Sequence, residues 1–428
     1  MKLILGLGKT GLSIAKFLAT KNSIYRIADS RLQPPFLSEL LAEMPNATPV
    51  LGDWTQDLLD DIEEILVSPG IAENEPIIIW ARTLNIPIIS DIELFSRYAK
   101  APVIGITGSN GKSTVTQLLG EMIANDGKNV AVGGNIGKPA LDCLTDKVDF
   151  YVLELSSYQL DYTQKLTLIT GVVLNITPDH LERYPDFSAY IDSKLSLYDY
   201  CQQPVFNLDE KHTPNDTGFS LNMPKNERDF GTVNCHGSYY ILKGDESLMC
   251  VDDMSLIGKH NVVNVLAALA LGDKIGLNID SMIATIKAFK NLEHRLEWVA
   301  KKQNIDYYND SKATNSNATI TAINALIGRY KNISLILGGI AKNEDYSELF
   351  ALINQRITSV ILIGQDAQAF KNNIDVQTTF AASMQEAVDC ANNSDCEVVL
   401  LSPACASFDM FDNFEKRGEA FKACITDL

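Results

Sequence analysis

Short apolar runs rich in β-branched residues recur along this chain, and glycines and then helix-periodic segments follow them. The runs are LILG (3–6), VIGIT (103–107), YVLEL (151–155), ISLILGG (333–339) and VVLLSP (398–403). This repeated order of strand, loop and helix is typical of parallel sheets that are covered by helices. We therefore predict an α/β protein.

The chain has 428 residues, which is more than one hydrophobic core organises, and we expect three domains. The strand–glycine pattern restarts near residue 90 and again near residue 292. The predicted domains are therefore 1–90, 91–291 and 292–428. The polar segment 209–237 is rich in Asn, Asp, Pro and Gly, so we expect an irregular or β-rich insertion there rather than a linker.

Composition and charge exclude several classes of partner. The formal net charge is −18 at pH 7 and no run of Lys or Arg could neutralise a phosphate backbone, so we expect no nucleic acid partner. The eight cysteines form no Cys-x-x-Cys pair, which favours thiols in a reducing cytosol. The amino-terminal apolar run is too short for a signal peptide, and we expect a cytoplasmic protein without membrane insertion.

A first glycine motif, GLGKTG at 6–11, follows the first expected strand and opens a helix. Asp29 ends the next expected strand, 18 residues after Gly11. This arrangement matches the dinucleotide-binding fingerprint, in which the acidic residue reaches a ribose hydroxyl. The glycines could also serve only a tight turn and close helix packing, and the motif does not say which nucleotide would bind.

A second glycine motif, TGSNGKST at 107–114, resembles a phosphate loop but has Ile106 where the strict pattern places its first glycine. Gly108 and Gly111 allow backbone N–H groups to approach an anion, Lys112 can reach terminal phosphates, and Ser113 can bind Mg²⁺. Apolar residues at helical spacing follow at 115, 118, 119, 122 and 123, and a stop is expected at 125–127. The alternative is a glycine-rich turn with a solvated lysine.

Polar residues downstream extend this site. Glu154 ends the expected strand 151–155, where a phosphate-loop protein places a carboxylate partner of Mg²⁺. His180 follows another apolar run and could bind a metal ion or bridge buried polar groups. Lys194 looks like a surface lysine from its neighbours alone. Further polar clusters lie at 258–264, 292–297, 309–315 and 402–409.

Together these residues resemble one family, the ATP-dependent amide ligases of peptidoglycan precursor synthesis known as the Mur ligases. The family's phosphate loop is T-G-x-N-G-K-[ST] and lacks the earlier glycine, as this chain does at Ile106. Six ordered motifs spread the resemblance over essentially the whole chain: VSPGIA (67–72), DIELF (91–95), GGNIG (133–137), LELSSYQL (153–160), NDSKATN (309–315) and SPACASFDMFDNFEKRG (402–418). They are most similar to the branch of the family that adds D-glutamate.

The resemblance implies three α/β domains: a Rossmann-like N-terminal domain for a UDP moiety, a central P-loop ATPase domain with a mostly parallel sheet, and a Rossmann-like C-terminal domain for the incoming amino acid. It implies an ATP-dependent ligase that joins D-glutamate to UDP-N-acetylmuramoyl-L-alanine through an acyl phosphate. ATP would be the co-substrate, with two Mg²⁺ ions. We expect a monomer.

Site roles follow from the same resemblance. The residues implied for the UDP-linked substrate are Lys9, Thr10, Asp29, Ser30, Arg31, Ser68 and Asn135. Those implied for ATP are Gly108, Ser109, Asn110, Gly111, Lys112, Ser113 and Thr114, with Asn264 on adenine, Asp310 on ribose, and Arg295 and Lys312 on phosphate. Ser113, Glu154, His180 and a carbamylated Lys194 would hold metal, and the catalytic set would be Lys112, Glu154, His180 and Lys194. D-Glutamate would contact Thr314, Lys342, Ser407 and the backbone at Phe414.

The chain departs from the family's pattern at one position, and two alternative functions remain. Ile340 stands where the family usually has Asp after paired glycines, and we expect altered tuning of the amino-acid site rather than lost function. A sister ligase that adds another amino acid is one alternative, and the 402–409 motif and Lys342 discriminate against it. A non-catalytic nucleotide-binding regulator is the other, and it would lack the second-ion ligands His180 and Lys194.

Overall fold

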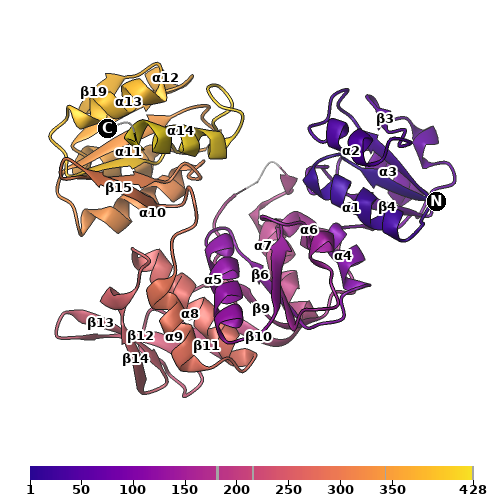
Figure 1. Ribbon diagram of the computed structural model, residues 1–428, viewed down its shortest axis with the longest axis horizontal. Helices are drawn as coiled ribbons and strands as arrows, with labels where there is room; N and C mark the ends of the chain where they lie inside the picture. The colour runs from indigo at the N-terminus through magenta and orange to yellow at the C-terminus, as the bar shows by residue number, and fades with distance from the viewer. Residues whose placement is uncertain (180–182, 215, 343, 427–428) are drawn as a thin grey trace. The chain divides into compact units, whose positions relative to one another are not determined.

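The computed structural model describes residues 1–179, 183–214, 216–342 and 344–426 (Figure 1). Contacts divide the chain into two compact units, Met1–Asp253 with Val263–Lys287, and Met254–Val262 with Ala288–Leu428. Over the described residues the strands form three sheets, of five, nine and six strands. The first two sheets belong to the first unit and the third to the second. These helix-covered sheets confirm the predicted α/β class.

The first sheet is parallel and has the order β3-β2-β1-β4-β5. Its strands are β1 (Lys2–Leu5), β2 (Tyr25–Asp29), β3 (Val50–Leu51), β4 (Glu64–Val67) and β5 (Ile88–Ile89), and its helices are α1 (Lys9–Thr20), α2 (Leu37–Glu43) and α3 (Pro76–Thr83). The chain moves outward from β1 on both sides, so the strand order reverses between β1 and β4. Ligands of open α/β sheets bind at such a reversal, beyond the carboxyl ends of the strands.

The second sheet has the order β14-β13-β12-β11-β10-β9-β6-β8-β7. Its strands are β6 (Val103–Thr107), β7 (Val130–Gly134), β8 (Phe150–Glu154), β9 (Leu168–Val173), β10 (Cys201–Asn207), β11 (Gly218–Phe219), β12 (Phe230–Cys235), β13 (Ser238–Lys243) and β14 (Glu246–Cys250). The strands from β7 to β12 are parallel, and β13 and β14 are antiparallel. Over its described residues, the segment 209–237 is irregular except for β11 and β12, which join the sheet, so the prediction of an irregular or β-rich insertion rather than a linker is confirmed.

Helices of the second sheet include α4 (Asp91–Ser96), α5 (Lys112–Asn125), α6 (Ser157–Asp161), α7 (Phe187–Leu195), α8 (Lys259–Lys274) and α9 (Ile279–Ala288). The five apolar positions predicted for α5 are all fully buried. The helix ends at Asn125, and Gly127 has a φ of +79°, which confirms the predicted stop. Among the described residues, we find no helix with the length and apolar character needed to cross a membrane.

The third sheet has the order β15-β16-β20-β17-β18-β19, and only β15 is antiparallel to its neighbour. Its strands are β15 (Glu297–Lys302), β16 (Ile305–Asn309), β17 (Ile333–Gly338), β18 (Ser359–Ile363), β19 (Gln377–Phe380) and β20 (Val398–Leu401). Its helices are α10 (Ser316–Ile327), α11 (Ser347–Arg356), α12 (Ala367–Lys371), α13 (Met384–Asn392) and α14 (Phe414–Thr426). Leu335 and Ile336 point into different cores because successive strand residues face opposite sides of the sheet.

A buried cluster of hydrogen-bonded polar side chains in the first unit joins two of the sequence motifs. Asp91 is 2% exposed, and the Gln159 side-chain amide donates to both of its carboxylate oxygens, at 3.0 and 3.2 Å. The carboxylate of Glu93 accepts the backbone N–H groups of Gln164 and Lys165, each at 2.8 Å. The DIELF and LELSSYQL motifs are therefore joined by hydrogen bonds between α4 and the α6 region.

This buried cluster predicts that the free energy of unfolding depends on pH. Burial raises the pKa of Asp91 to about 6 although Gln159 donates to it. A carboxyl with a raised pKa adds stability that is complete below its unfolded pKa and is lost as the pH rises through about 6. Calorimetry should compare the free energies of unfolding of Asp91→Asn and the wild type from about pH 4 to about pH 7. As the pH rises, the variant should become more stable relative to the wild type, by up to about 3 kcal/mol, because the amide stays neutral.

The matched control is Asp146→Asn, since the Asp146 side chain is 80% exposed. Its curve should run parallel to that of the wild type across this pH range. A parallel curve for Asp91→Asn as well would contradict the role assigned to burial.

Candidate active site

The second glycine motif forms a loop between β6 and α5. Gly108 and Gly111 have φ values of +146° and +85°, which side chains rarely adopt. The ammonium of Lys112 donates to the carbonyls of Gly108 at 2.8 Å and Ser109 at 3.1 Å. Ile106, at the position of the missing glycine, is fully buried in β6, and the first glycine of this loop, Gly108, follows two residues later.

Side chains from a neighbouring segment hold this loop. The backbone N–H of Asn110 donates to the Asn175 side chain at 2.8 Å, and the Asn175 amide donates back to the Asn110 carbonyl at 2.9 Å. The Ser109 hydroxyl donates to the Thr177 carbonyl at 2.9 Å and lies 3.1 Å from the Tyr190 hydroxyl. The predicted site did not include these partners, although Asn175 and Thr177 lie in the polar run that contains His180.

Asn264 approaches the same loop from α8. A Cβ atom placed on Gly111 would lie 2.3 Å from the Asn264 side-chain oxygen, so any other residue would displace the Asn264 side chain. Asn264 is 5% exposed. The structure therefore brings together the loop and the residue that the resemblance implies for adenine.

Ser113 and Glu154 meet beneath the loop. The Ser113 hydroxyl donates to one Glu154 carboxylate oxygen at 2.7 Å, and the Asn135 side-chain amide donates to the other at 2.8 Å. Glu154 is 2% exposed and ends β8, as predicted. Within the described ranges no three His, Cys, Asp or Glu side chains gather as a metal cluster. His180 lies outside the described residues.

Lys194 lies in the same place although its sequence context did not single it out. Its side chain is 2% exposed on α7, and its ammonium donates to the Gly108 carbonyl at 3.0 Å. It also lies 4.6 Å from the centre of the Tyr190 ring. Burial, with the nearby charge of Lys112, lowers the pKa of Lys194 to about 7. This amine therefore loses its proton far more readily than an ordinary lysine.

The first glycine motif surrounds a carboxylate at the reversal of the first sheet. Asp29 accepts the Leu7 backbone N–H at 2.6 Å and a two-point contact from Arg31, at 2.8 and 2.7 Å. Burial opposes ionisation, but the hydrogen bonds of Arg31 and Leu7 outweigh it and lower the pKa of Asp29. Ser30 lies exposed between the two charged residues.

Other residues implied for the UDP-linked substrate surround this loop. The Ser68 hydroxyl donates to the Gly6 carbonyl at 2.9 Å, and the Lys9 ammonium donates to the Gly137 carbonyl at 2.6 Å. Thr10 lies in the first turn of α1. The GLGKTG, VSPGIA and GGNIG motifs are thus in contact within the first unit.

In the second unit, Asp310 follows β16 and is held in place by two donors. The Ser402 hydroxyl donates to it at 2.7 Å and the Leu296 backbone N–H at 3.0 Å. Burial raises the pKa of Asp310 to about 7, against these hydrogen bonds. The Lys312 ammonium lies 3.9 Å from the centre of the Phe414 ring. Arg295 directly precedes Leu296, so the residues implied for ribose and phosphate come from adjoining loops.

The residues implied for D-glutamate also come from adjoining loops of the second unit. Ile340 and Ala406 form an antiparallel bridge with N–H···O distances of 3.0 Å in both directions. This bridge brings the segment of Lys342 beside that of Ser407. Only the Ile340 backbone takes part, so replacing the family's usual Asp leaves the bridge intact. Thr314 lies just before Asn315, which caps α10.

Arg417 was missed as a functional residue, although it lies within the 402–418 motif. It is 1% exposed and donates to the Ser311 hydroxyl at 3.0 Å, the Ser311 carbonyl at 2.8 Å and the Cys405 carbonyl at 3.1 Å. The Ser311 hydroxyl in turn donates to the Phe414 carbonyl at 2.8 Å. One buried guanidinium therefore joins the loops that carry Lys312, Ser407 and Phe414.

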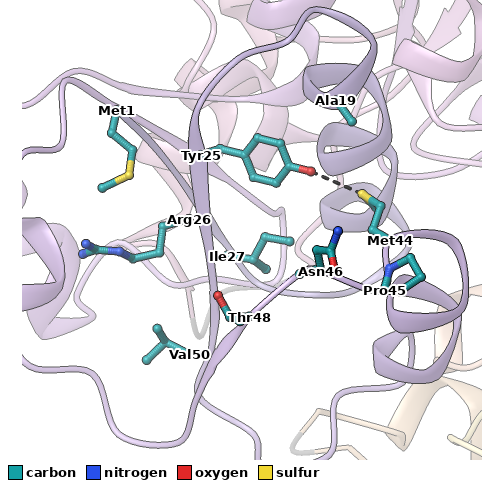
Figure 2. A pocket seen from close by; sticks show the side chains of 11 residues that line it. Met1, Ala19, Tyr25, Arg26, Ile27, Met44, Pro45, Asn46, Thr48 and Val50 are labelled. Atoms are coloured by element: carbon teal, nitrogen blue, oxygen red, sulfur yellow. Dashed lines mark hydrogen bonds between the residues drawn. The ribbon is translucent and has the colours of Figure 1, made fainter.

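A separate hollow lies away from these residues. A cavity of about 630 Å³ opens beside the start of β2. Figure 2 shows Tyr25, Arg26 and Met44 around it, with the Tyr25 hydroxyl donating to the Met44 sulfur at 3.2 Å. Tyr25 begins β2 whereas Asp29 ends it. The cavity therefore lies at the opposite end of the strand from the glycine loop.

Comparison with known proteins places the chain in a family. Three family models match successive parts of it: the MurD-like N-terminal domain of Mur ligases at 1–90, the Mur ligase middle domain at 106–272 and the Mur ligase glutamate ligase domain at 294–405. The UDP-N-acetylmuramoylalanine–D-glutamate ligase of Nitrosococcus oceani is 44% identical over 440 residues, 99% of this chain and 96% of the relative. The ligase of the same name from Marinobacter nauticus is 43% identical and covers 100% and 98%.

Solved structures share the fold. UDP-N-acetylmuramate–alanine ligase MurC from Thermotoga maritima has a TM-score of 0.66 at 16% identity, covering 100% of this chain and 99% of that one. A pseudomurein peptide ligase type C from Methanothermus fervidus has a TM-score of 0.61 at 16% identity, with the same coverage. The full-length identity above 40% and the three successive family matches show that this chain belongs to the Mur ligase family.

Proposed function

We propose that this protein is an ATP-dependent ligase that adds D-glutamate to UDP-N-acetylmuramoyl-L-alanine in peptidoglycan precursor synthesis. The names of the full-length relatives support this substrate pair. The observation that carries the chemistry is the convergence of Lys112 and Lys194 on one phosphate-loop carbonyl, that of Gly108. Lys112 beside a loop of this kind suits the handling of a transferred phosphoryl group, and Lys194 next to it is placed to hold a metal ion once it is carbamylated.

The reaction activates a carboxylate, because joining it to an amine in water is uphill. A carboxylate oxygen of the UDP-linked substrate attacks the γ-phosphorus of ATP, the bond to the β–γ bridging oxygen breaks, and ADP leaves. The amine of D-glutamate then attacks the acyl carbon, loses a proton and displaces phosphate. Lys112 is placed to balance charge on the phosphoryl group, so no protein nucleophile is needed.

The residues present fit Mg²⁺, which prefers oxygen ligands from one or two carboxylates together with phosphate. Ser113 and Glu154 offer a hydroxyl and a carboxylate 2.7 Å apart. His180 and a carbamate on Lys194 would hold a second ion. When bound, Mg²⁺ would neutralise charge on the phosphates.

Carbamylation of Lys194 has a physical basis in this chain. Carbon dioxide reacts with a neutral amine, and the lowered pKa of Lys194 makes that form accessible near neutral pH. The product carries negative oxygens, which suit a cation better than an ammonium does.

We assign the remaining ligands by domain. Residues 1–90 would bind the UDP moiety through Lys9, Thr10, Asp29, Ser30, Arg31 and Ser68, with Asn135 from the second domain. Residues 91–291 would bind ATP through the loop at 108–114 and Asn264, and residues 292–428 would supply Arg295, Asp310 and Lys312 for ATP and Thr314, Lys342, Ser407 and Phe414 for D-glutamate. We also propose that the protein is a monomer and works in the cytoplasm.

Phosphate release tests the reaction. Purified protein with Mg-ATP and UDP-N-acetylmuramoyl-L-alanine should release phosphate when D-glutamate is added, because only the complete reaction turns over the acyl phosphate. Reactions with L-glutamate or without the UDP-linked substrate serve as controls. Equal rates with both glutamate enantiomers, or no release at all, would reject the proposed function, and turnover with another amino acid would identify a sister ligase.

Replacing Lys194 tests the carbamate. Lys194→Ala should lower the turnover number by at least about tenfold, because a ligand of the second ion is lost. Added formate or acetate should partly restore turnover by supplying the missing carboxylate oxygens. The control is Lys165→Ala, at an exposed lysine of the same unit. Full activity of Lys194→Ala would exclude the carbamate role.

Two glycines that flank α5 distinguish the effect of backbone strain from the effect of steric fit. Both Gly111 and Gly127 have positive φ, but a Cβ atom at Gly127 would meet nothing within 4 Å, whereas at Gly111 it would meet Asn264. Calorimetric titration with an ATP analogue should show about a tenfold loss of affinity for Gly111→Ala and little change for Gly127→Ala. Equal effects of the two substitutions would contradict the fit between the loop and Asn264.

A further inference from the structure

Arg183 reaches from the second sheet's domain to the VSPGIA loop of the first. Its guanidinium donates to the Pro69 carbonyl at 2.8 Å and also to the Ile71 carbonyl. These acceptors lie 114 and 112 residues earlier in the chain. The contact is made to backbone oxygens, so it holds the course of the loop rather than any one side chain.

Two aromatic rings hold the guanidinium in place. Its central carbon lies 4.0 Å from the centre of the Tyr158 ring, within the range of a cation–π contact. The Tyr184 ring stacks beside Tyr158, with centroids 6.1 Å apart and planes at 15°, and its hydroxyl donates to Asp161 at 2.8 Å. Tyr158 and Asp161 belong to α6, which starts three residues after Glu154. The support of Arg183 is therefore continuous with the end of β8.

The loop that Arg183 holds transmits its position to the first glycine motif. The Ile71 backbone N–H donates to the Ser68 carbonyl at 3.0 Å and closes a turn. Ser68 in turn donates from its backbone to Leu5 and from its hydroxyl to Gly6, both at 2.9 Å. Gly6 and Ser68 are also close, because a Cβ atom on Gly6 would lie 3.0 Å from the Ser68 Cβ. A shift of the turn would therefore move the rim of the proposed UDP site.

The geometry calls for arginine rather than lysine. A planar guanidinium can donate to two acceptors in parallel and stack on an aromatic ring at the same time, whereas an ammonium can do neither as well. Both acceptors belong to one short turn, so replacing the guanidinium breaks two hydrogen bonds to that turn at once.

We propose that Arg183 is a positioning residue for the UDP-linked substrate: it fixes the turn 68–71 on α6 and thereby orders the sugar-nucleotide site. This inference rests on the proposed function. It gives Arg183 no contact with the reacting atoms, so its effect falls on substrate affinity and not on the chemical step.

The test measures two ligands on the same variants. Isothermal titration with UDP-N-acetylmuramoyl-L-alanine should show affinity about tenfold weaker for Arg183→Ala, while the affinity for a Mg²⁺-loaded ATP analogue stays within about twofold. In steady-state assays KM for the UDP-linked substrate should rise by a similar factor, with kcat and the KM for ATP near wild type. The affinity of Arg183→Lys for the UDP-linked substrate should fall between those of the wild type and Arg183→Ala, because the ammonium keeps the charge but cannot donate to two acceptors in parallel.

The control is Arg82→Ala, which removes a half-exposed arginine of α3 that pairs with Glu73. It should leave both affinities unchanged. Unaltered binding of the UDP-linked substrate to Arg183→Ala, or an equal loss for both ligands, would overturn the positioning role; if Arg183→Ala does not fold, Arg183→Lys decides by the same criteria. A wild-type protein that fails to bind the UDP-linked substrate would instead reject the proposed function, and the inference with it.

Discussion

The pairing of β6 with its two parallel neighbours is the constraint on which the candidate active site depends. Ile106 lies opposite Glu154 of β8 and Val172 of β9 in the register of the sheet. Because the strands run in the same direction, the phosphate loop, Glu154 and the segment of Asn175 all emerge at one edge. A register shifted by one residue would move Glu154 to the other face of the sheet and separate it from Ser113.

Electrostatics at that edge are balanced by carbonyls and one carboxylate. Lys112 and Lys194 both donate to Gly108, and the charge of Lys112 disfavours the charged form of Lys194. Burial adds to this repulsion for Lys194, whose pKa falls, whereas Glu154 is satisfied by Ser113 and Asn135. The charges of Asp179, Asp161 and Glu154 oppose the lowering of the Lys194 pKa but do not cancel it. The result favours the neutral amine of Lys194, which is the form that the proposed carbamylation requires.

Two guanidinium groups, the buried one of Arg417 and the half-buried one of Arg183, serve similar ends in the two units. Arg417 joins the Ser311 and Cys405 loops of the second unit, and Arg183 joins a loop of the first sheet to α6. Each donates to backbone carbonyls of residues that lie outside the strands and helices. Such contacts hold irregular loops in one conformation, and ligand-binding loops need that order.

Local patterns in the sequence were enough to predict the α/β class, the apolar stripe and end of α5, the place of Glu154 at the end of a strand, and both glycine loops. These features were predictable because strand periodicity, helix periodicity and glycine spacing each involve only a few neighbouring residues. The ordered motifs also identified the family. The resemblance implied a role for Lys194, but its burial beside Gly108 depended on tertiary structure, as did the contacts of Asn175, Arg183 and Arg417. Lys194 lies 86 residues from Gly108 and Arg417 lies 106 from Ser311, so only the register of the sheets and the packing of helices on them bring those groups together. The sequence determined the elements and the loop chemistry, whereas the tertiary structure decided which distant side chains those loops meet and how deeply each is buried.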